Sequence, residues 1–308
     1  MTGGAGFIGA NLCRALSTSA GVGRVVAVDD LSTGRRDNLT GVAGVELVEG
    51  SILDPDLLDA VTGDADVVVH LAARPSVARS VQDPMASHLA NATGTVEVLE
   101  AARRGRRPHV IVASSSSVYG ANLALPKRED MVALPVSPYA ASKLAAEAYT
   151  LAYGSSFDLP VLAFRFFNVF GPFQGADHDY AAVVPAFVSA ALRGEPLTIH
   201  GDGRQTRDFT FVGTVVAILV EALRHRVTSP TPVNLAFGSR VSLLELAELL
   251  EGVLGRRLPR RHAPRRPGDV QDSQADQAAL RGLFTDVSPV TLPDGLRATV
   301  DWFRQAGG

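Results

Sequence analysis

The sequence is poor in cysteine and in basic charge, and it has no long apolar run. Its 308 residues contain one cysteine, which excludes an internal disulfide and favours a reducing compartment such as the cytoplasm. The 29 Lys and Arg residues are outnumbered by 32 Asp and Glu, which argues against a nucleic-acid partner that needs a basic surface. No segment is apolar over a length that crosses a bilayer, and we find no signal peptide, so no membrane contact is expected.

Short apolar runs alternate with helical patterns in the first half of the chain. Buried strands are predicted at residues 24–28, 45–48, 67–71, 110–113 and 161–164. Helices are predicted between them at residues 7–17, 54–61, 83–104 and 137–153. This alternation predicts an α/β fold with a Rossmann-like, doubly wound parallel sheet covered by helices on both faces.

The alternation breaks down after residue 167. Strands are predicted at 197–200, 209–212 and 233–236, and helices at 180–192, 214–226 and 241–254. We therefore expect a Rossmann domain at 1–167, to which residues 208–235 return, and a smaller, mixed α/β substrate domain at 168–308. Residues 256–266 are basic and contain proline, so a solvated loop is expected there, with a phosphate site as the alternative.

The chain start carries a glycine pattern, G-x-x-G-x-x-G, formed by Gly3, Gly6 and Gly9. Such glycines permit a tight turn and bring a pyrophosphate close to the N-terminus of the helix that follows. A buried strand should come before this turn, yet only Met1 does. We therefore expect that the natural protein starts earlier or that the central strand is missing, which would leave two unpaired edges in the sheet.

Asp29 lies twenty residues beyond Gly9, at the end of a predicted strand. An acid in this position binds the ribose diol of a dinucleotide and repels a 2′-phosphate, so NAD is favoured over NADP. Arg35 and Arg36 follow closely and keep NADP as the alternative.

Three residues of the middle segment have the chemistry of a hydride-transfer site. Tyr139 and Lys143 lie four residues apart, which puts a phenol and an ammonium on one helix face, and Ser115 precedes Tyr139 by 24 residues. A nearby cation favours the phenolate, so Tyr139 is expected to exchange a proton at neutral pH.

The chain resembles the extended short-chain dehydrogenases/reductases and, among them, the UDP-hexose 4-epimerases. The matching stretches run in the family's order: TGGAGFIG (2–9), DDLSTG (29–34), HLAA (70–73), SSSSVYG (114–120), YAASK (139–143), RFFNVFGP (165–172), GDGRQTRDF (201–209) and RPGD (266–269). The resemblance implies that Tyr139 is the catalytic base and acid, that Lys143 binds the nicotinamide ribose, and that Ser115 bonds the reacting sugar oxygen.

The resemblance also implies contacts to NAD. Residues implied there, besides Tyr139 and Lys143, are Gly3, Gly6, Phe7, Ile8, Gly9, Asp29, Asp30, Ser32, Thr33, Gly34, Ser51, Ile52, Leu71, Ala72, Ala73, Ser114, Phe166 and Val169. Ser51 departs from the family pattern, which often has Asp there.

A second set of residues is implied to bind a UDP-sugar. Asn168, Arg207 and Arg266 match phosphate contacts, Asp269 a uridine-ribose ligand, and Thr198 and His200 flank the uracil. The set also includes Ser115, Ser116, Val183 and Ser273. His200 has no partner ligands, so no metal site is expected.

The family contains several reactions, and the residues after Ser115 bear on them. A sugar 4,6-dehydratase needs an Asp and a Glu where this chain has Ser116 and Ser117, so dehydration is disfavoured. Uronate relatives carry Arg shortly after the FGP turn, where this chain has Phe173-Gln174-Gly175, so a UDP-glucuronate 4-epimerase is a disfavoured alternative. Reversible oxidation at C4 through a 4-keto sugar remains, with a reductase and an NAD(P)-sensing scaffold as further alternatives.

Ser273 bears on the choice of hexose. Some relatives have a bulky Tyr there, and a serine leaves room for an N-acetyl group. UDP-GlcNAc/UDP-GalNAc is therefore expected beside UDP-glucose/UDP-galactose. The resemblance further implies a homodimer through the helix that carries Tyr139.

Overall fold

The computed structural model describes residues 1–176, 181–265 and 270–306. Six parallel strands form the central sheet, in the order β2 (Val45–Glu49), β1 (Val25–Asp29), β3 (Val67–His70), β4 (His109–Ser115), β5 (Val161–Phe166) and β10 (Val233–Leu235). Five of these strands follow one another in the sequence with helices between them. The predicted α/β class and the parallel sheet are therefore confirmed.

The start of the chain lies between β1 and β3. Thr2 bridges Val28 on one side and His70 on the other, both in parallel. Its N–H donates to the carbonyl of Val69 at 3.0 Å, and the N–H of Val28 donates to the carbonyl of Met1 at 2.8 Å. The turn at Gly3 thus leaves the sheet at its centre, where the order of the strands reverses and α/β sheets bind their ligands.

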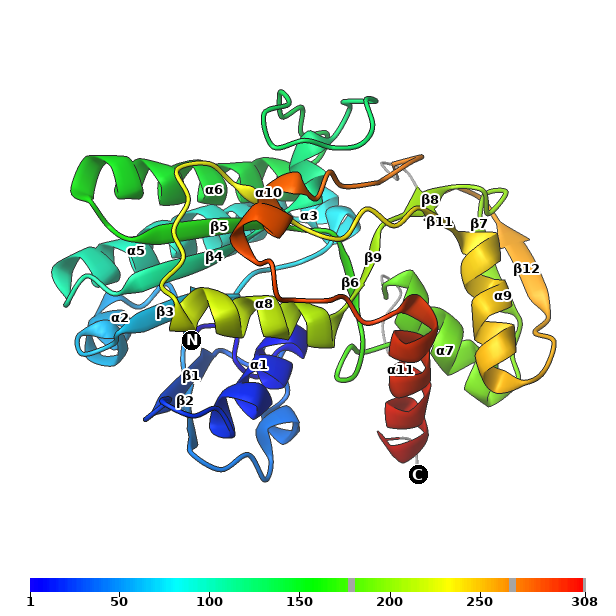
Figure 1. The fold of residues 1–308 in the computed structure, drawn as a ribbon, viewed down its shortest axis with the longest axis horizontal. Helices are drawn as coiled ribbons and strands as arrows, with labels where there is room; N and C mark the ends of the chain where they lie inside the picture. Colours follow the sequence, from blue (N-terminus) through cyan, green and yellow to red (C-terminus); the bar gives the residue numbers. More distant parts are fainter. Residues whose placement is uncertain (177–180, 266–269, 307–308) are drawn as a thin grey trace.

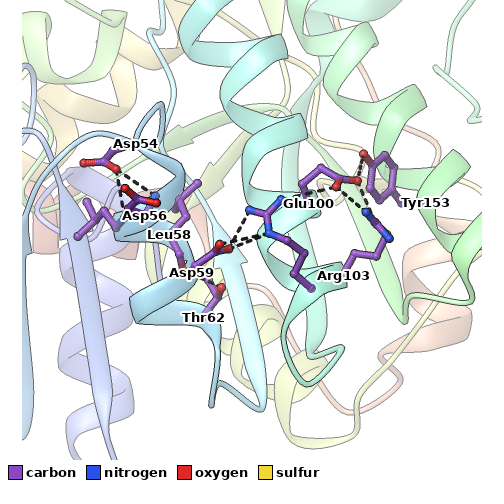
Figure 2. Close-up of polar contacts among 10 residues, drawn as sticks. Asp54, Asp56, Leu58, Asp59, Thr62, Glu100, Arg103 and Tyr153 are labelled. Atoms are coloured by element: carbon purple, nitrogen blue, oxygen red, sulfur yellow. Dashed lines mark hydrogen bonds and ion pairs between the residues drawn. The ribbon is translucent and has the colours of Figure 1, made fainter.

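Helices cover both faces of this sheet (Figure 1). One face is covered by α1 (Phe7–Ser17) and α8 (Val212–Arg224), which pack on each other, and the other by α2 (Pro55–Thr62), α5 (Gly94–Arg104) and α6 (Pro138–Phe157). The helix starts follow capping chemistry: Asp54 accepts the N–H groups of Asp56 and Leu57 at 3.1 Å ahead of α2. Figure 2 shows this cap and the polar contact between α5 and α6, in which Tyr153 donates to Glu100 at 2.7 Å.

The helix predicted at 83–104 is confirmed from Pro84 to Arg104, with a π-helical turn inside it, and a short helix that was not predicted comes before it. The structure has α3 (Val77–Gln82), α4 (Pro84–His88), a wide π-helical turn η2 (Leu89–Thr93) and then α5. The break between α3 and α4 follows from Asp83, which caps α4 with its side chain ahead of Pro84, because proline has no N–H with which to continue a helix. The predicted helix at 137–153 starts one residue later, after the cap Ser137, and extends to Phe157.

The second half of the chain adds a smaller group of elements beside the sheet (Figure 1). Three strand pairs lie here: β6 (Asn168–Phe170) with β9 (Phe209–Phe211), β7 (Leu197–His200) with β12 (Arg260–Ala263), and β8 (Thr206–Arg207) with β11 (Val241–Ser242). The helices are α7 (Val183–Arg193), α9 (Leu243–Leu254), α10 (Ala278–Leu283) and α11 (Leu292–Ala306). Phe170, Phe187, Leu197, Leu246 and Leu296 form part of a separate buried core between them.

Two features of this half bear on the sequence predictions. The loop expected at 256–266 is wrong in part, because four residues of this basic segment form the strand β12, which pairs in parallel with β7. The pairing of β10 with β5 and the packing of α8 on α1 support the return of residues 208–235 to the Rossmann unit, whose boundaries stay a prediction. Two short 3-10 helices follow strands: η1 (Arg36–Leu39) comes after β1, and η3 (Ser116–Tyr119) comes after β4. No helix in the described ranges has the length and apolar character needed to cross a membrane.

Candidate functional site

A cleft of about 840 Å³ opens at the carboxyl ends of β1, β3, β4 and β5. This volume is typical of pockets that enclose a small-molecule ligand. The cleft is lined by all of the residues implied to contact NAD except Gly34, namely Gly3, Gly6, Phe7, Ile8, Gly9, Asp29, Asp30, Ser32, Thr33, Ser51, Ile52, Leu71, Ala72, Ala73, Ser114, Tyr139, Lys143, Phe166 and Val169, and also by Ser115. The fold therefore brings into one cavity residues that are spread over 167 positions of the sequence.

The glycine turn at the floor of this cleft has no space for larger residues. Gly3 has φ +70°, and a Cβ on it would lie 2.6 Å from the amide nitrogen of Ala72. A Cβ on Gly9 would lie 2.1 Å from the carbonyl oxygen of Gly3. The N-terminus of α1 has no side-chain cap, so its first N–H groups face the cleft side as an anion site. These features fit the pyrophosphate of a dinucleotide.

Asp29 is the last residue of β1 and lies against the glycine turn. It is 8% exposed, and its carboxylate accepts the N–H groups of Ala5 at 2.9 Å and Leu31 at 3.0 Å. Burial raises the pKa of Asp29, while these hydrogen bonds act in the opposite direction. Gly34 packs against this carboxylate, since a Cβ there would lie 2.6 Å from Oδ1, so Gly34 supports Asp29 and does not line the cleft. Two acids, Asp29 and Asp30, thus line the end where a ribose diol would bind.

Tyr139 and Lys143 project into the cleft from the first turns of α6. Ser137 caps this helix by accepting the N–H of Ala140 at 3.1 Å, and Pro138 occupies the first helical position. The ammonium of Lys143 is buried and donates to the carbonyl of Ala113 at 2.7 Å. Ser115, at the end of β4, lies beside the phenol and hydrogen-bonds to it.

Burial has the largest effect on the ionisation of this pair. Burial raises the pKa of Tyr139, and the hydrogen bond from Ser115 lowers it. Burial also lowers the pKa of Lys143 to about 8. Burial therefore acts on both groups, and the lowering of the phenol pKa by Lys143 stays a prediction. Ser115 is the group that favours the phenolate here.

The hydroxyl of Ser115 is oriented by a residue that the sequence did not single out for this role. Ser117 donates to Ser115 Oγ twice, from its N–H at 3.2 Å and from its hydroxyl at 2.9 Å. A serine oxygen has two acceptor positions and one proton. With both acceptor positions filled, the proton of Ser115 is left to donate toward Tyr139 and any oxygen bound beside it.

Of the residues implied to bind a UDP-sugar, those that the structure describes lie outside the cleft lining, apart from Ser115. Asn168 lies between two residues that do line it, Phe167 and Val169, and its Nδ2 donates to the carbonyl of Asp208 at 3.3 Å. Arg207 donates to the carbonyl of Thr206, and the same carbonyl accepts the N–H of Ser273 at 3.2 Å. The structure thus brings together the segments that carry Asn168, Arg207 and Ser273.

The remaining members of this set are more dispersed. Thr198 and His200 lie on β7, where Thr198 accepts from Arg261 at 3.0 Å and His200 contacts the carbonyl of Pro264 at 3.0 Å. Val183 is the first residue of α7, and Ser116 lies in η3. Arg266 and Asp269 lie outside the described residues. The role of each in sugar binding stays a prediction.

Several cleft residues were not among those implied to contact NAD or the sugar. They are Val28, Gly50, Leu53, Arg74, Pro75, Arg79, Gln82, Ala86, Ala90, Ala113, Phe167 and Gln174. Arg79, Gln82, Ala86 and Ala90 have helical spacing and form one wall across α3, α4 and η2, and the first two lie on α3, a helix that was not predicted. Gln174 donates from Nε2 to the carbonyl of Val169 at 3.2 Å, and its Oε1 is buried without a partner among the described residues.

The chain is similar to known proteins over nearly its whole length. Residues 1–236 match the NAD dependent epimerase/dehydratase family. The chain is 39% identical over 310 residues to the UDP-glucose 4-epimerase of Mycolicibacterium smegmatis, covering 99% of this chain and 97% of that protein.

Two solved structures are similar over the whole fold. The UDP-N-acetylglucosamine 4-epimerase of Methanobrevibacter ruminantium, in complex with UDP-N-acetylmuramic acid, has a TM-score of 0.93 at 34% identity and covers 99% of this chain and 97% of its own. The UDP-glucuronic acid 4-epimerase of Bacillus cereus, in complex with UDP-glucuronic acid and NAD, has a TM-score of 0.88 at 32% identity and covers 99% and 98%. This chain therefore belongs to the NAD-dependent epimerase/dehydratase family, and its cofactor is NAD.

Proposed function

We propose that this protein inverts UDP-hexoses at C4, interconverting UDP-glucose with UDP-galactose and UDP-GlcNAc with UDP-GalNAc. The observation that carries the proposal is the meeting of Ser115, Tyr139 and Lys143 in a cleft that fits NAD. The similarity to 4-epimerases over nearly the full chain supports it. NAD held in this cleft would supply the reversible hydride chemistry at C4, by way of a transient 4-keto sugar.

The protein's own groups manage the proton and the position of the sugar. Tyr139 removes the proton of the 4-hydroxyl as that carbon is oxidised and gives it back on reduction. Ser115, with both acceptor positions filled by Ser117, donates to the reacting oxygen. Lys143 donates to the carbonyl of Ala113, and we propose that it also binds the nicotinamide ribose. Asn168, Arg207 and Arg266 are proposed to hold the diphosphate while the hexose turns, because guanidinium forks pair well with phosphate oxygens.

Two local features favour a neutral hexose over a uronate. At the position after the FGP turn this chain has Phe173, whose ring packs 5.4 Å from that of Trp302 and under the guanidinium of Arg14, in place of an arginine. Gln174 instead offers a buried amide oxygen without a partner in the described structure, which is an acceptor for a hydroxyl and repels a carboxylate. UDP-glucuronate remains the alternative substrate, since one similar structure is that of a UDP-glucuronic acid 4-epimerase.

The test is incubation of the purified protein with UDP-glucose, UDP-GlcNAc and UDP-glucuronate in separate reactions, without added NAD, followed by proton NMR. Inversion at C4 of the neutral sugars supports the proposal. Conversion of UDP-glucuronate alone would replace it by the uronate reaction, and a 4-keto-6-deoxy product would replace it by dehydration. A stoichiometric need for added NADH would indicate a reductase. NAD binding without turnover of any of these sugars would indicate a sensing scaffold.

Replacing Ser273 by Tyr tests the preference for acetamido sugars. Ser273 is half-buried and adjoins Thr206 beside Arg207, so a phenol there would occupy space next to the proposed sugar site. We expect turnover of UDP-GlcNAc to fall about tenfold, since overpacking costs about 1–3 kcal/mol, while turnover of UDP-glucose changes little. Steady-state kinetics with both substrates measure the difference. An equal loss for both would contradict a selective role.

Replacing Ser115 by Ala tests the source of the phenol's acidity. The hydrogen bond from Ser115 lowers the pKa of Tyr139, so its removal leaves that pKa higher. If the phenolate is the working base, activity rises with pH through this pKa, and the rise in kcat should move to higher pH in the variant. We also expect kcat to fall about 10²-fold at neutral pH, as for other lost donors to a reacting oxygen. A pH profile equal to that of the parent would show that Ser115 does not set the acidity of Tyr139.

A homodimer and a cytoplasmic location remain part of the proposal. Val81 on α3, Met85 on α4 and Tyr149 on α6 are exposed by 64%, 63% and 48%, and these helices pack together on the face of the molecule that carries Tyr139. A second copy would cover this apolar surface. Light scattering of the purified protein measures the mass of the assembly.

A further inference from the structure

A buried ion pair lies directly behind the catalytic residues. Arg165 on β5 and Glu147 on α6 form two parallel hydrogen bonds, from Nε to Oε2 at 2.9 Å and from Nη2 to Oε1 at 2.6 Å. Their side chains are only 5% and 4% exposed. Neither residue lines the cleft, so the mechanism above does not use them.

The remaining hydrogen-bonding capacity of the pair ties it to β4 and to the chain before α6. Ser114 donates from its hydroxyl to Glu147 Oε2 at 2.7 Å, and Arg165 donates from Nη1 to the carbonyl of Glu129 at 3.2 Å. The guanidinium of Arg165 also lies 4.7 Å from the centre of the Tyr119 ring. The planar fork of arginine is therefore held from several sides, which fixes its orientation and that of Glu147.

The pair acts on the same helix face as the catalytic residues. Tyr139, Lys143 and Glu147 are spaced four residues apart, so they lie along one side of α6. Three consecutive residues at the end of β4 meet them: the carbonyl of Ala113 accepts from Lys143, Ser114 bonds Glu147, and Ser115 bonds Tyr139. The rotation and the height of α6 over β4 are thus set by these three contacts together.

Such a pair adds little to the stability of the fold, but it fixes the relative position of the two elements that it joins. Two buried charges lose much of their attraction to desolvation, and apolar residues of similar size often replace them without loss of stability. A bidentate pair of arginine and carboxylate, by contrast, fixes both the distance between the two side chains and the plane in which they lie. A displacement of about 1 Å between reacting groups can lower a rate about 10²-fold.

We propose that the Glu147–Arg165 pair is a positioning device that fixes α6 against β4 so that Tyr139 meets Ser115. The expected effect of the pair on turnover rests on the proposed function. The expected effect of the pair on the titration of Tyr139 can be measured without any substrate.

The decisive variant is the double replacement Glu147→Leu with Arg165→Met, which removes both charges and keeps the volume. We expect its melting temperature to stay within a few degrees of the parent and its NAD content to be retained. We expect kcat to fall at least about tenfold with KM changed less, by the geometric argument above. Tyr139 should titrate at higher pH, because its hydrogen bond from Ser115 loosens. Ultraviolet difference titration against the Tyr139→Phe variant isolates this phenol and needs no turnover.

A matched control lies on the same helix. Tyr153→Phe removes the hydrogen bond from α6 to Glu100 of α5, which ties α6 to a neighbouring helix and not to β4 (Figure 2). It should leave both kcat and the titration of Tyr139 at parental values. If the parent itself converts no UDP-sugar, the proposed function fails, yet the shifted titration still tests the positioning role.

The inference is overturned if the double variant folds and keeps the parental kcat and the parental titration of Tyr139. It is also overturned if the rate falls only in proportion to lost folded protein or lost NAD, because the pair would then be merely structural. Should the double variant not fold, Arg165→Lys keeps the charge balance and removes the fork. That variant must show the same upward shift of the Tyr139 titration, and a parental titration with parental kcat would overturn the inference.

Discussion

Replacing Tyr139 by Phe is expected to lower kcat for C4 inversion by about 10²–10⁴-fold, the range that a positioned acid or base contributes. The change removes only the phenol oxygen, so the ring still fills its place at the start of α6. Lys143 keeps its hydrogen bond to the carbonyl of Ala113, and the glycine turn is untouched. NAD binding should therefore be unchanged, as measured by the cofactor content of the purified variant.

Tyr149 offers the control for this experiment, since it lies on the same helix and is 48% exposed. Tyr149→Phe should have parental kinetics. A Tyr139→Phe variant that turns over as fast as the parent would remove the chemical basis of the proposed function. Loss of NAD together with activity would show instead that the phenol holds the cofactor.

Replacing Gly9 by Ala should abolish tight binding of NAD. The added methyl group would lie 2.1 Å from the carbonyl oxygen of Gly3 and 2.8 Å from the Cα of Gly4, so backbone atoms of the turn must move. Losing one N–H contact to the charged pyrophosphate costs about 1.5–3 kcal/mol, which weakens binding about 10–150-fold. The displaced turn should also destabilise the fold by about 1–3 kcal/mol.

Calorimetric titration with NAD and thermal unfolding measure these two effects. Gly252→Ala is the matched control, because Gly252 lies in α9 and a Cβ there would meet no atom within 4 Å. That variant should bind NAD normally and unfold at the same temperature or slightly higher, since alanine favours helix. Normal NAD affinity in Gly9→Ala would show that the pyrophosphate does not bind at this turn.

The sequence was sufficient where the signal is local. The β-branched runs gave the strands of the central sheet within one or two residues, because buried parallel strands are continuous apolar segments. The glycine turn and Asp29 follow from steric and charge requirements that a spacing can express. The four-residue interval of Tyr139 and Lys143 places both on one helix face in any environment.

Contacts between distant segments decided the rest. The strands β6, β8 and β12 have two to four residues each, too few for a periodic pattern, and exist because partners from elsewhere in the chain pair with them. Ser114, Glu147 and Arg165 contact one another but come from three different elements, so no spacing in the sequence predicts their contact.

The ionisation of Tyr139 shows the same division. The sequence determined that a phenol and an ammonium share a helix face, but only the tertiary structure decided that the ammonium turns to the carbonyl of Ala113 and that Ser115 reaches the phenol. Spacing fixes which residues are neighbours along a helix. Which charges are desolvated, and which donors face them, depends on the packing of α6 against β4, and desolvation sets the direction of both pKa shifts.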